Sequence, residues 1–479
     1  MSSDPFPLAA RLRWLDRLDR LVAADAETLV GRCVEEISKP RHEAIAAEIL
    51  PLRAAIRWAK ANLPGLLRTE VVTGRPWWLL GQRHWVVRAP LGRVAIIATW
   101  NYPIQLLGIQ LVQALAAGNR VVVKPSERAP RTQERLLELA VAAGLPDGQL
   151  SWVRPTREAG RILLETERFD HVVFTGSTEV GREIAAVAAR SLTPTTLELS
   201  GRDSAFVLGD ADPSLAARVL WQCVEMNAGQ TCMAPRRILV DRLVWRGFLD
   251  ALAPLAAAAR PRLLIDEAAA ARTSRVAAAA IASGGRSLSG AFEPAIGRAM
   301  RPVAVIDPDR GADLVAGDHF GPAVAVLPVD GVEDALAVHE ACDQHLATSV
   351  FTAQPRRVDA FFPRLRASVV TINDVILPTA HPAVSIGGER RSGWGLSRGR
   401  EGLLAMTRAA TVSTTSTRWR VPPRAPDART TAMLARLAAW GRGAARPPAL
   451  DEATPKVPST AEATPSAARS REDACATRP

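Results

Sequence analysis

The sequence predicts an α/β fold built on a doubly wound parallel sheet, and two observations support this prediction. Between residues 93 and 206, short apolar runs alternate with segments of helical periodicity. The apolar runs span residues 94–98, 120–123, 150–153, 171–174 and 196–199, and the helical segments span residues 104–117, 132–143, 158–165 and 178–189. Such alternation is typical of a parallel sheet with helices on both faces. A further α/β stretch, from residue 205 to about 404, predicts a second domain.

The flanking segments have patterns of their own. Residues 8–62 carry apolar side chains at helical spacing, which predicts helices. Residues 71–87 are rich in Val and Trp around glycines and predict a β-hairpin, and residues 400–417 end in a β-prone run. Residues 443–479 are rich in Pro, Ala, Ser, Thr and Glu without an aromatic residue, which predicts a disordered tail.

Composition excludes several classes of protein. The 479-residue chain has a net charge of +11, but only four basic residues are lysines and the arginines are scattered among alanines. We therefore expect no nucleic-acid partner. Five widely spaced cysteines without a C-x-x-C motif predict neither a disulfide framework nor a zinc site, and they favour a reducing, cytoplasmic location. Because no stretch reaches the roughly 20 apolar residues of a membrane span, we predict no integral membrane segment.

Cys232 and Glu198 are the candidate nucleophile and base. Cys232 lies in Asn-Ala-Gly-Gln-Thr-Cys-Met, and Glu198 lies 34 residues upstream in Leu-Glu-Leu-Ser-Gly. Taken alone, a single cysteine is usually a small buried hydrophobe, and a glutamate at a strand end is usually solvated. The Gly-Gln before Cys232 instead predicts a loop that presents the thiol to a pocket. A thiol and a carboxylate in these settings fit a nucleophile with its base.

Asn101 is a candidate oxyanion donor. The run Trp100-Asn101-Tyr102-Pro103 ends the first predicted strand, where open α/β sheets place their ligands. Asn101 could be only a turn residue before a helix. Alternatively, its amide and the backbone N–H of Cys232 could stabilise the negative oxygen that forms when a thiolate adds to a carbonyl.

Three further motifs suggest a phosphate-containing cofactor. Lys-Pro-Ser-Glu at residues 124–127 follows the second strand, although a solvated charged turn is the alternative. Residues 174–181, Phe-Thr-Gly-Ser-Thr-Glu-Val-Gly, run from a strand into a helix whose N-terminus could accept a phosphate. This is not the G-x-G-x-x-G fingerprint, so alone it is weak. Asp-His-Phe-Gly-Pro follows at residues 318–322.

Together, these motifs resemble those of the aldehyde dehydrogenase superfamily, over about residues 5–440. That family reads N-x-G-Q-x-C, L-E-L-G-G, W-N-x-P, K-P-S-E, F-T-G-S-x-x-x-G and E-x-F-G-P at the matching places. The resemblance implies NAD(P)-dependent oxidation of an aldehyde to a carboxylic acid through a thiohemiacetal and a thioester on Cys232. Glu198 is then the general base and Asn101 the oxyanion donor. The implied cofactor contacts are Trp100, Lys124, Ser126, Glu127, Gly176, Ser177, Val180, Gly181, Asp318 and Phe320.

The chain departs from the family pattern at a few positions. Ser200 replaces a glycine, at a place that could need glycine's backbone freedom. Asp318 is one methylene shorter than the family's Glu, and Ile386 replaces a Phe on the substrate side. These changes keep open a catalytically impaired nucleotide-binding homologue. A CoA-acylating relative is another alternative, although Glu198 argues against it because thiolysis needs no water-activating base.

The resemblance also implies finer properties. A carboxylate at Glu127 would accept from a ribose hydroxyl and repel a 2′-phosphate, which favours NAD while leaving NADP possible. The short N-terminus and the run at residues 419–423 resemble the class 3, fatty-aldehyde branch, which implies a homodimer. No charge occurs at the predicted tunnel positions, which favours an apolar aldehyde of medium or long chain; these positions are Tyr102, Leu106, Ile109, Thr231 and Met233. Helical periodicity offers an alternative for Leu106 and Ile109, which could simply face the core.

These inferences divide the chain into domains. We predict an NAD(P)-binding Rossmann-like domain from residues 1–70 and 89–200, and an α/β catalytic domain from residues 201–403. The predicted oligomerisation β-segments are residues 71–88 and 404–425, followed by a C-terminal helix at 426–442 and the tail at 443–479.

Overall fold

The computed structural model describes residues 6–76, 79, 81–417 and 427–439. The chain divides into a large unit, residues 1–415, and a second unit, residues 416–479. The second unit contains helix α16 (Ala428–Ala439), inside the segment predicted to form the C-terminal helix. The predicted tail at residues 443–479 and residues 418–425 of the second oligomerisation segment lie outside the described residues.

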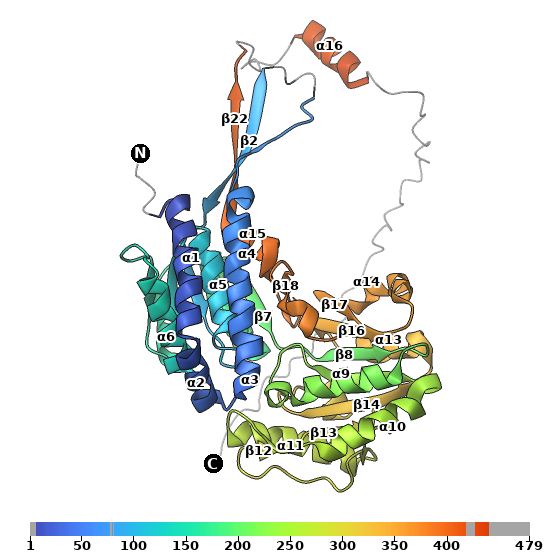
Figure 1. The fold of residues 1–479 in the computed structure, drawn as a ribbon. Coiled ribbons are helices and arrows are strands. Elements are labelled where there is room, and N and C mark those ends of the chain that lie inside the picture. The colour runs from blue at the N-terminus through green and yellow to red at the C-terminus, as the bar shows by residue number, and fades with distance from the viewer. Residues whose placement is uncertain (1–5, 77–78, 80, 418–426, 440–479) are drawn as a thin grey trace, which may run out of the picture. The chain divides into compact units, whose positions relative to one another are not determined.

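The first part of the large unit is a helical layer, as its periodicity predicts. It contains α1 (Leu8–Ala24), α2 (Ala26–Ile37), α3 (Arg41–Ala44), a π-helical turn (Ile45–Ile49) and α4 (Leu50–Leu66). Trp14, Leu15 and Leu18 of α1 are buried in one core cluster with Leu52 and Ile56 of α4. Figure 1 shows α1 and α4 running beside α5 (Gln105–Ala116) of the first sheet.

A three-stranded antiparallel arm extends from this layer (Figure 1). The predicted hairpin is present as β1 (Glu70–Val71) paired with β2 (Gln82–Pro90), but its first strand ends at Val71. Residues 77, 78 and 80 of that prediction lie outside the described residues. The main partner of β2 is β22 (Thr407–Thr415), which pairs with it from Gln82 to Pro90. Segments more than 300 residues apart in the sequence therefore form one ribbon.

The predicted strand and helix alternation between residues 93 and 206 is confirmed. Within the described residues the first sheet has six strands in the order β20-β7-β6-β3-β4-β5, all parallel except β20. The strands are β3 (Arg93–Ile97), β4 (Arg120–Lys124), β5 (Leu150–Trp152), β6 (His171–Gly176), β7 (Thr195–Leu199) and β20 (Gly393–Trp394). The helices are α5, α6 (Pro130–Ala142), α7 (Arg157–Thr166) and α8 (Thr178–Arg190).

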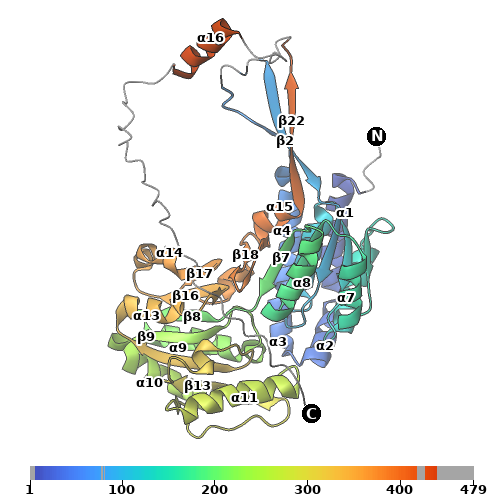
Figure 2. The ribbon, with the colours of Figure 1, turned by 180° about the vertical axis from the view of Figure 1, so that it is seen from behind.

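Alternating side chains of β3 show that the first sheet is covered on both faces. Val94 and Ile96 are buried in the cluster that contains α1, α4, α5 and α6. Ala95 and Ile97 are buried in a separate cluster with Leu163 of α7 and with α8. Figure 2 shows α7 and α8 in front of this sheet, on the face opposite α1 and α4. The period-2 burial is what a strand between two helical layers requires.

The strand β20 comes from a late part of the chain. Gly393 pairs with Glu198 and Trp394 with Leu197, in antiparallel register at the edge of the first sheet. Gly393 has φ +102°, and an added Cβ would lie 1.9 Å from the Leu197 carbonyl oxygen. Only glycine fits this position, because an L side chain would collide and rarely adopts such a φ.

The second α/β stretch forms a second sheet, in the order β11-β13-β14-β9-β8-β16-β17 within the described residues. Its strands are β8 (Asp203–Val207), β9 (Pro235–Asp241), β11 (Arg286–Ser287), β13 (Val303–Ile306), β14 (Ala323–Val329), β16 (Ala347–Phe351) and β17 (Val369–Ile372). Its helices are α9 (Pro213–Glu225), α10 (Arg242–Ala258), α11 (Glu267–Ala282), α12 (Asp313–Ala316), α13 (Gly331–Glu340) and α14 (Phe362–Leu365). The late helix α15 (Gly399–Ala405) instead buries Leu403 in the core cluster of α1, α4 and α5. Short strands complete the unit: β10 (Arg262–Leu263), β12 (Ala299–Met300), β15 (Gln344–His345), β18 (Ile386–Gly387), β19 (Glu389–Arg390) and β21 (Leu396–Ser397).

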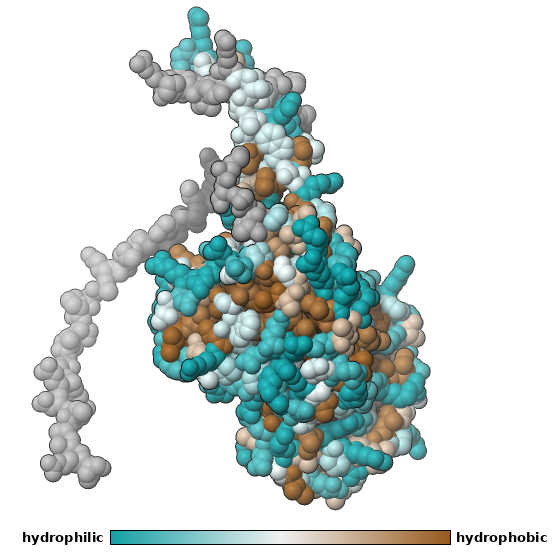
Figure 3. Space-filling view, turned by 60° about the vertical axis from the view of Figure 1, so that its left-hand side comes forward, coloured by the Kyte–Doolittle hydropathy of each residue, from teal (hydrophilic) through white to brown (hydrophobic). Residues whose placement is uncertain are grey.

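Arginines on the surface are often paired with carboxylates. Arg364 contacts Glu333 and Glu340, and Arg310 contacts Asp334. Figure 3 shows hydrophilic residues distributed among apolar ones over the visible face. None of the helices within the described ranges combines the length and apolarity needed to cross a bilayer.

Candidate active site

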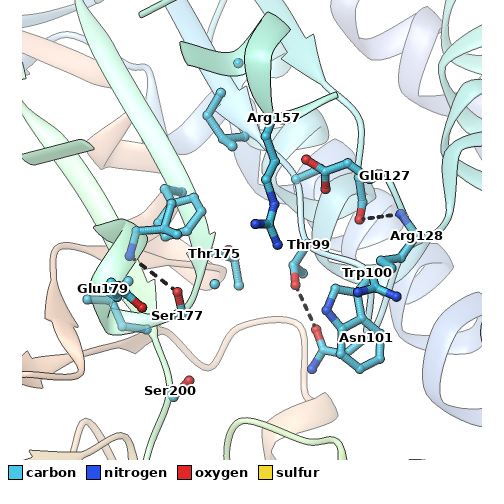
Figure 4. A pocket seen from close by; sticks show the side chains of 18 of the residues that line it. Thr99, Trp100, Asn101, Glu127, Arg128, Arg157, Thr175, Ser177, Glu179 and Ser200 are labelled. Atoms are coloured by element: carbon cyan, nitrogen blue, oxygen red, sulfur yellow. Dashed lines mark hydrogen bonds between the residues drawn. The ribbon is translucent and has the colours of Figure 1, made fainter. Parts of the chain in front are cut away.

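One cavity of about 840 Å³ lies at the carboxyl ends of the first sheet's parallel strands. Its wall includes residues that follow β3, β4, β5, β6 and β7, together with the loop that carries Cys232. Figure 4 shows Trp100, Asn101, Glu127 and Ser177 around this cavity. Most residues predicted for the site line it: Trp100, Asn101, Lys124, Ser126, Glu127, Gly176, Ser177, Val180, Glu198, Cys232, Asp318 and Phe320. Parallel strands bring their carboxyl ends to one edge, and this explains the convergence of motifs from distant segments.

Gly181 is the predicted site residue that does not line the cavity. It lies in the first turn of α8, and an added Cβ would meet a Leu199 methyl carbon at 2.5 Å. Glycine here allows the helix to approach β7 closely. Close packing of α8 on β7 therefore explains the glycine at position 181, whereas Gly176 lines the cavity.

The loop that carries Cys232 follows α9 and has an unusual backbone. Asn227 and Ala228 have φ of +52° and +54°, and Gly229 continues the left-handed run with φ +68°. An added Cβ at Gly229 would lie 2.5 Å from the backbone of Gly321, so the loop passes directly against that segment. Cys232 is half-buried and is a free thiol at the cavity wall. The sequence predicts that a loop presents this thiol to a pocket, and in the structure Cys232 lies in a loop at the cavity wall.

The surroundings of Cys232 disfavour its thiolate in the absence of substrate. Burial, followed by the negative charge of Glu198, raises the pKa of the thiol to about 12. The Arg398 guanidinium and the backbone N–H of Cys232 act in the opposite direction. The thiol is therefore protonated at neutral pH, and a base must accept its proton when it reacts.

Glu198 is buried on β7 and accepts hydrogen bonds from different parts of the chain. Gln110 Nε2 lies 3.4 Å and Thr175 Oγ1 3.3 Å from its Oε2. Ser397 donates to its Oε1. These donors fix the carboxylate at the wall of the cavity that Cys232 also lines. A carboxylate held in this way can accept a proton from the thiol or from a water.

Asn101 is buried after β3 and bridges to the loop that carries Cys232. Its Nδ2 donates to the Gln230 carbonyl at 3.1 Å, and its Oδ1 accepts from Thr99 Oγ1 at 3.1 Å (Figure 4). The Asn227 amide donates to the carbonyls of Asn101 at 2.9 Å and of Gln230 at 3.0 Å. The amide of Asn101 is thereby held against the loop that carries Cys232.

The cofactor side of the cavity has the groups that a dinucleotide requires. Ser177 caps α8, with its Oγ accepting from Val180 N at 3.3 Å, and the helix presents its N-terminus at the wall. A helix N-terminus favours a phosphate. Lys124 Nζ lies 2.6 Å from Glu127 Oε1 at the end of β4, and the rings of Trp100 and Phe320 meet edge to face at 5.9 Å. The donor set and the cavity therefore fit NAD(P).

The departures from the family pattern have local explanations. Ser200 is not among the non-glycine residues with positive φ, so this position does not need glycine's freedom. Its carbonyl accepts from Gln344 Nε2 at 2.6 Å and from Ser392 Oγ at 3.0 Å. Ile386 is buried in a cluster with Met233, and Asp318 remains at the cavity wall.

Sequence reasoning missed several residues. Arg157 points into the cavity near Glu127 and Thr99 (Figure 4). Because it follows the parallel strand β5, its position in the sequence could have indicated a place at this edge of the sheet. Gln110 and Arg398 act on Glu198 and Cys232 but look like ordinary helix and turn residues in the sequence. Lys39 and Glu48, buried behind Asn101, gave no signal either.

The comparisons with known proteins place these motifs in a family. A family model described as the aldehyde dehydrogenase family matches residues 4–412. The chain is 30% identical over 406 residues to a 4,4'-diapolycopene aldehyde oxidase of a Methylomonas species, covering 83% of this chain and 76% of that protein. It is 29% identical to a dimeric NADP-preferring aldehyde dehydrogenase of the dog, covering 82% and 87%. The solved structure of an NAD-dependent aldehyde dehydrogenase from Sinorhizobium meliloti superposes with a TM-score of 0.82, at 28% identity over 88% of this chain and 86% of that one.

Proposed function

Because the chain belongs to the aldehyde dehydrogenase family and is an NAD(P)-dependent aldehyde oxidoreductase, we propose that Cys232, Glu198 and Asn101 carry out its chemistry. One observation carries this proposal. Three residues from separate segments, the end of β3, the strand β7 and the loop after α9, meet at one cavity whose other wall has groups for a dinucleotide.

In the proposed reaction, the Cys232 sulfur adds to the carbonyl carbon of the aldehyde while Glu198 accepts the thiol proton. The carbonyl oxygen becomes negative, and the Asn101 amide and the Cys232 N–H stabilise it. NAD(P), when bound, supplies the acceptor for the hydride that leaves this carbon. Glu198 releases this first proton to solvent and then takes a proton from the water that attacks the thioester. This second proton returns to the departing Cys232 sulfur, so the carboxylic acid is released and the thiol is restored.

The substrate proposed is an apolar aldehyde of medium or long chain. Tyr102, Leu106, Ile109, Thr231 and Met233, the tunnel positions implied by the family resemblance, are all buried. Ile109 lines a small cavity together with Trp58 and Val112, but its volume of about 10 Å³ holds no alkyl chain as it stands. The support lies in the apolar character of these positions, because burying each methylene would gain about 0.8 kcal/mol. Support also comes from the relative named for a 4,4'-diapolycopene aldehyde. Arg398 lines the same small cavity, so a semialdehyde belongs in the test series.

Three further properties are proposed. NAD is preferred to NADP, because the Glu127 carboxylate lies at the cofactor wall. The protein is a homodimer through the β2–β22 arm, where Val71, Val72 and Val412 are exposed; the dog relative is named dimeric. The location is cytoplasmic, supported by the free thiols Cys33, Cys223, Cys232 and Cys342.

The test compares Glu198→Gln with Cys232→Ala on a panel of aldehydes, by burst-phase NADH release. Glu198→Gln is expected to release one equivalent of NADH more slowly than the parental enzyme, because solvent must then take the thiol proton, and to stall afterwards because the thioester is not hydrolysed. Cys232→Ala is expected to show no burst while it still binds NAD. Steady turnover at the parental rate in Glu198→Gln would place the base elsewhere.

The same assay separates the rival functions. The parental enzyme is expected to give the free acid with and without CoA. If acyl-CoA is the main product, the thioester is cleaved by CoA and not by water. Absence of any burst from the parental enzyme across the panel would indicate a homologue that has lost turnover.

A further inference from the structure

A buried ion pair lies directly behind the turn that carries Asn101. Lys39, in the connection between α2 and α3, pairs with Glu48 of the π-helical turn. The exposed fraction of both side chains is 0%. Replacing a buried ion pair of this kind by apolar residues is often neutral or stabilising. Stability alone therefore does not explain why this chain keeps two charges in its interior.

Both members of the pair are bonded to the Asn101 turn. Lys39 Nζ donates to the Asn101 carbonyl at 2.7 Å. Glu48 Oε2 accepts from the backbone N–H groups of Ile104 at 3.1 Å and Gln105 at 2.8 Å. These amides open α5, whose N-cap residue offers no side-chain acceptor. The pair thus holds the start of the turn and the start of the helix that follows it.

The same ammonium group also contacts Tyr102. Lys39 Nζ lies 3.6 Å from the centroid of the Tyr102 ring, within cation–π range. The Tyr102 hydroxyl lies 2.7 Å from Thr231 Oγ1, and Thr231 directly precedes Cys232. A continuous chain of contacts therefore runs from Lys39 through Tyr102 to the nucleophile.

We propose that the Lys39–Glu48 pair is a positioning device that sets the Asn101 amide and the Cys232 loop at their working separation. Neither side chain lines the active-site cavity, so both act through Asn101 and Tyr102 and not on the substrate. The proposal rests on the function proposed for Asn101. An oxyanion donor is effective only within a narrow range of distances, and a displacement of about 1 Å can cost about 100-fold in rate.

The test replaces both charges by side chains of similar size, Lys39→Met with Glu48→Gln. The double variant avoids leaving one buried charge unpaired. The expected result is a thermal midpoint near that of the parental enzyme, a kcat at least about tenfold lower, and a KM for aldehyde and a Kd for NAD changed less than about twofold. A matched control is Asp19→Asn with Arg53→Met, which removes a more exposed ion pair between α1 and α4 and is expected to leave kcat unchanged.

A double-mutant cycle with Asn101→Ala separates positioning from general loosening. If the pair acts through Asn101, Lys39→Met with Glu48→Gln lowers kcat by less than about twofold in the Asn101→Ala background. Full additivity, or a parental kcat in the folded double variant, would overturn the proposal. If Asn101→Ala itself keeps the parental kcat, the function proposed for Asn101 fails instead, and the two failures are thereby distinguished.

A milder variant covers the case in which the double variant does not fold. Glu48→Asp keeps both charges and withdraws the carboxylate by one methylene from the backbone N–H groups of Ile104 and Gln105. It is expected to lower kcat about three- to tenfold with KM unchanged, because the helix start is held less firmly. An unchanged kcat in this variant would contradict a positioning role.

Discussion

The reactivity of Cys232 towards iodoacetamide tests the electrostatics of the site in the absence of cofactor. Its pKa is raised from 9.0 to about 12. At pH 8 the thiolate fraction is then about one in ten thousand, against about one in ten for a thiol of pKa 9.0. A more basic thiolate is also more nucleophilic, by about 20-fold over three pKa units. We therefore expect alkylation about 50-fold slower than that of a free thiol of pKa 9.0.

The assay is mass-spectrometric incorporation of iodoacetamide at Cys232 between pH 7 and pH 10. Because the pKa is raised, the thiolate population grows about tenfold per pH unit and the rate is expected to rise without a plateau. Glu198→Gln removes the largest electrostatic cause of the shift and is expected to speed alkylation. Glu183→Gln, at the same cavity wall, is the control without this effect. A plateau below pH 9, or equal rates in both variants, would refute the reasoning.

The remaining predictions concern the cofactor, the helix α8 and the substrate. Glu127→Gln is expected to shift kcat/KM towards NADP, because it removes a carboxylate that repels a 2′-phosphate; an unchanged ratio would mean that Glu127 is not the selector. Gly181→Ala is expected to lower stability by about 1–3 kcal/mol in thermal unfolding, because its Cβ would overlap Leu199, and parental stability would contradict the packing argument. Across straight-chain aldehydes of about two to twelve carbons, kcat/KM is expected to rise with length; a flat series, or a preference for a semialdehyde, would point to Arg398 as the substrate partner.

Local periodicity was sufficient for most of the fold. The runs that became β3, β4, β6 and β7 are apolar and bounded by polar or glycine residues, and this is the sequence signal of strands buried on both faces. By contrast, β20 has two residues and pairs with a strand almost 200 positions away. A strand of two residues is too short to show a hydrophobic alternation, so the sequence does not predict this pairing.

The sequence predicts the site residues that follow the carboxyl ends of strands. It does not predict the buried residues that support them from the helical layer. Asn101, Glu127 and Ser177 follow the carboxyl ends of parallel strands, so the topology alone brings them together. Lys39 and Glu48 are charged residues, which sequence reasoning assigns to the surface by default. Their burial depends on a tertiary contact between the helical layer and the Asn101 turn, and composition carries no trace of that contact.

The late origin of β20 has a consequence for biosynthesis. While the ribosome is still adding residues up to 394, β7 has no partner along the edge that β20 will occupy. The Glu198 carboxylate on that strand also lacks its Ser397 hydrogen bond. An unpaired strand edge is a template for association with other chains. The nascent N-terminal part therefore exposes an unpaired edge of β7 that can associate with other chains. A chain that is truncated before residue 393 would keep this edge unpaired.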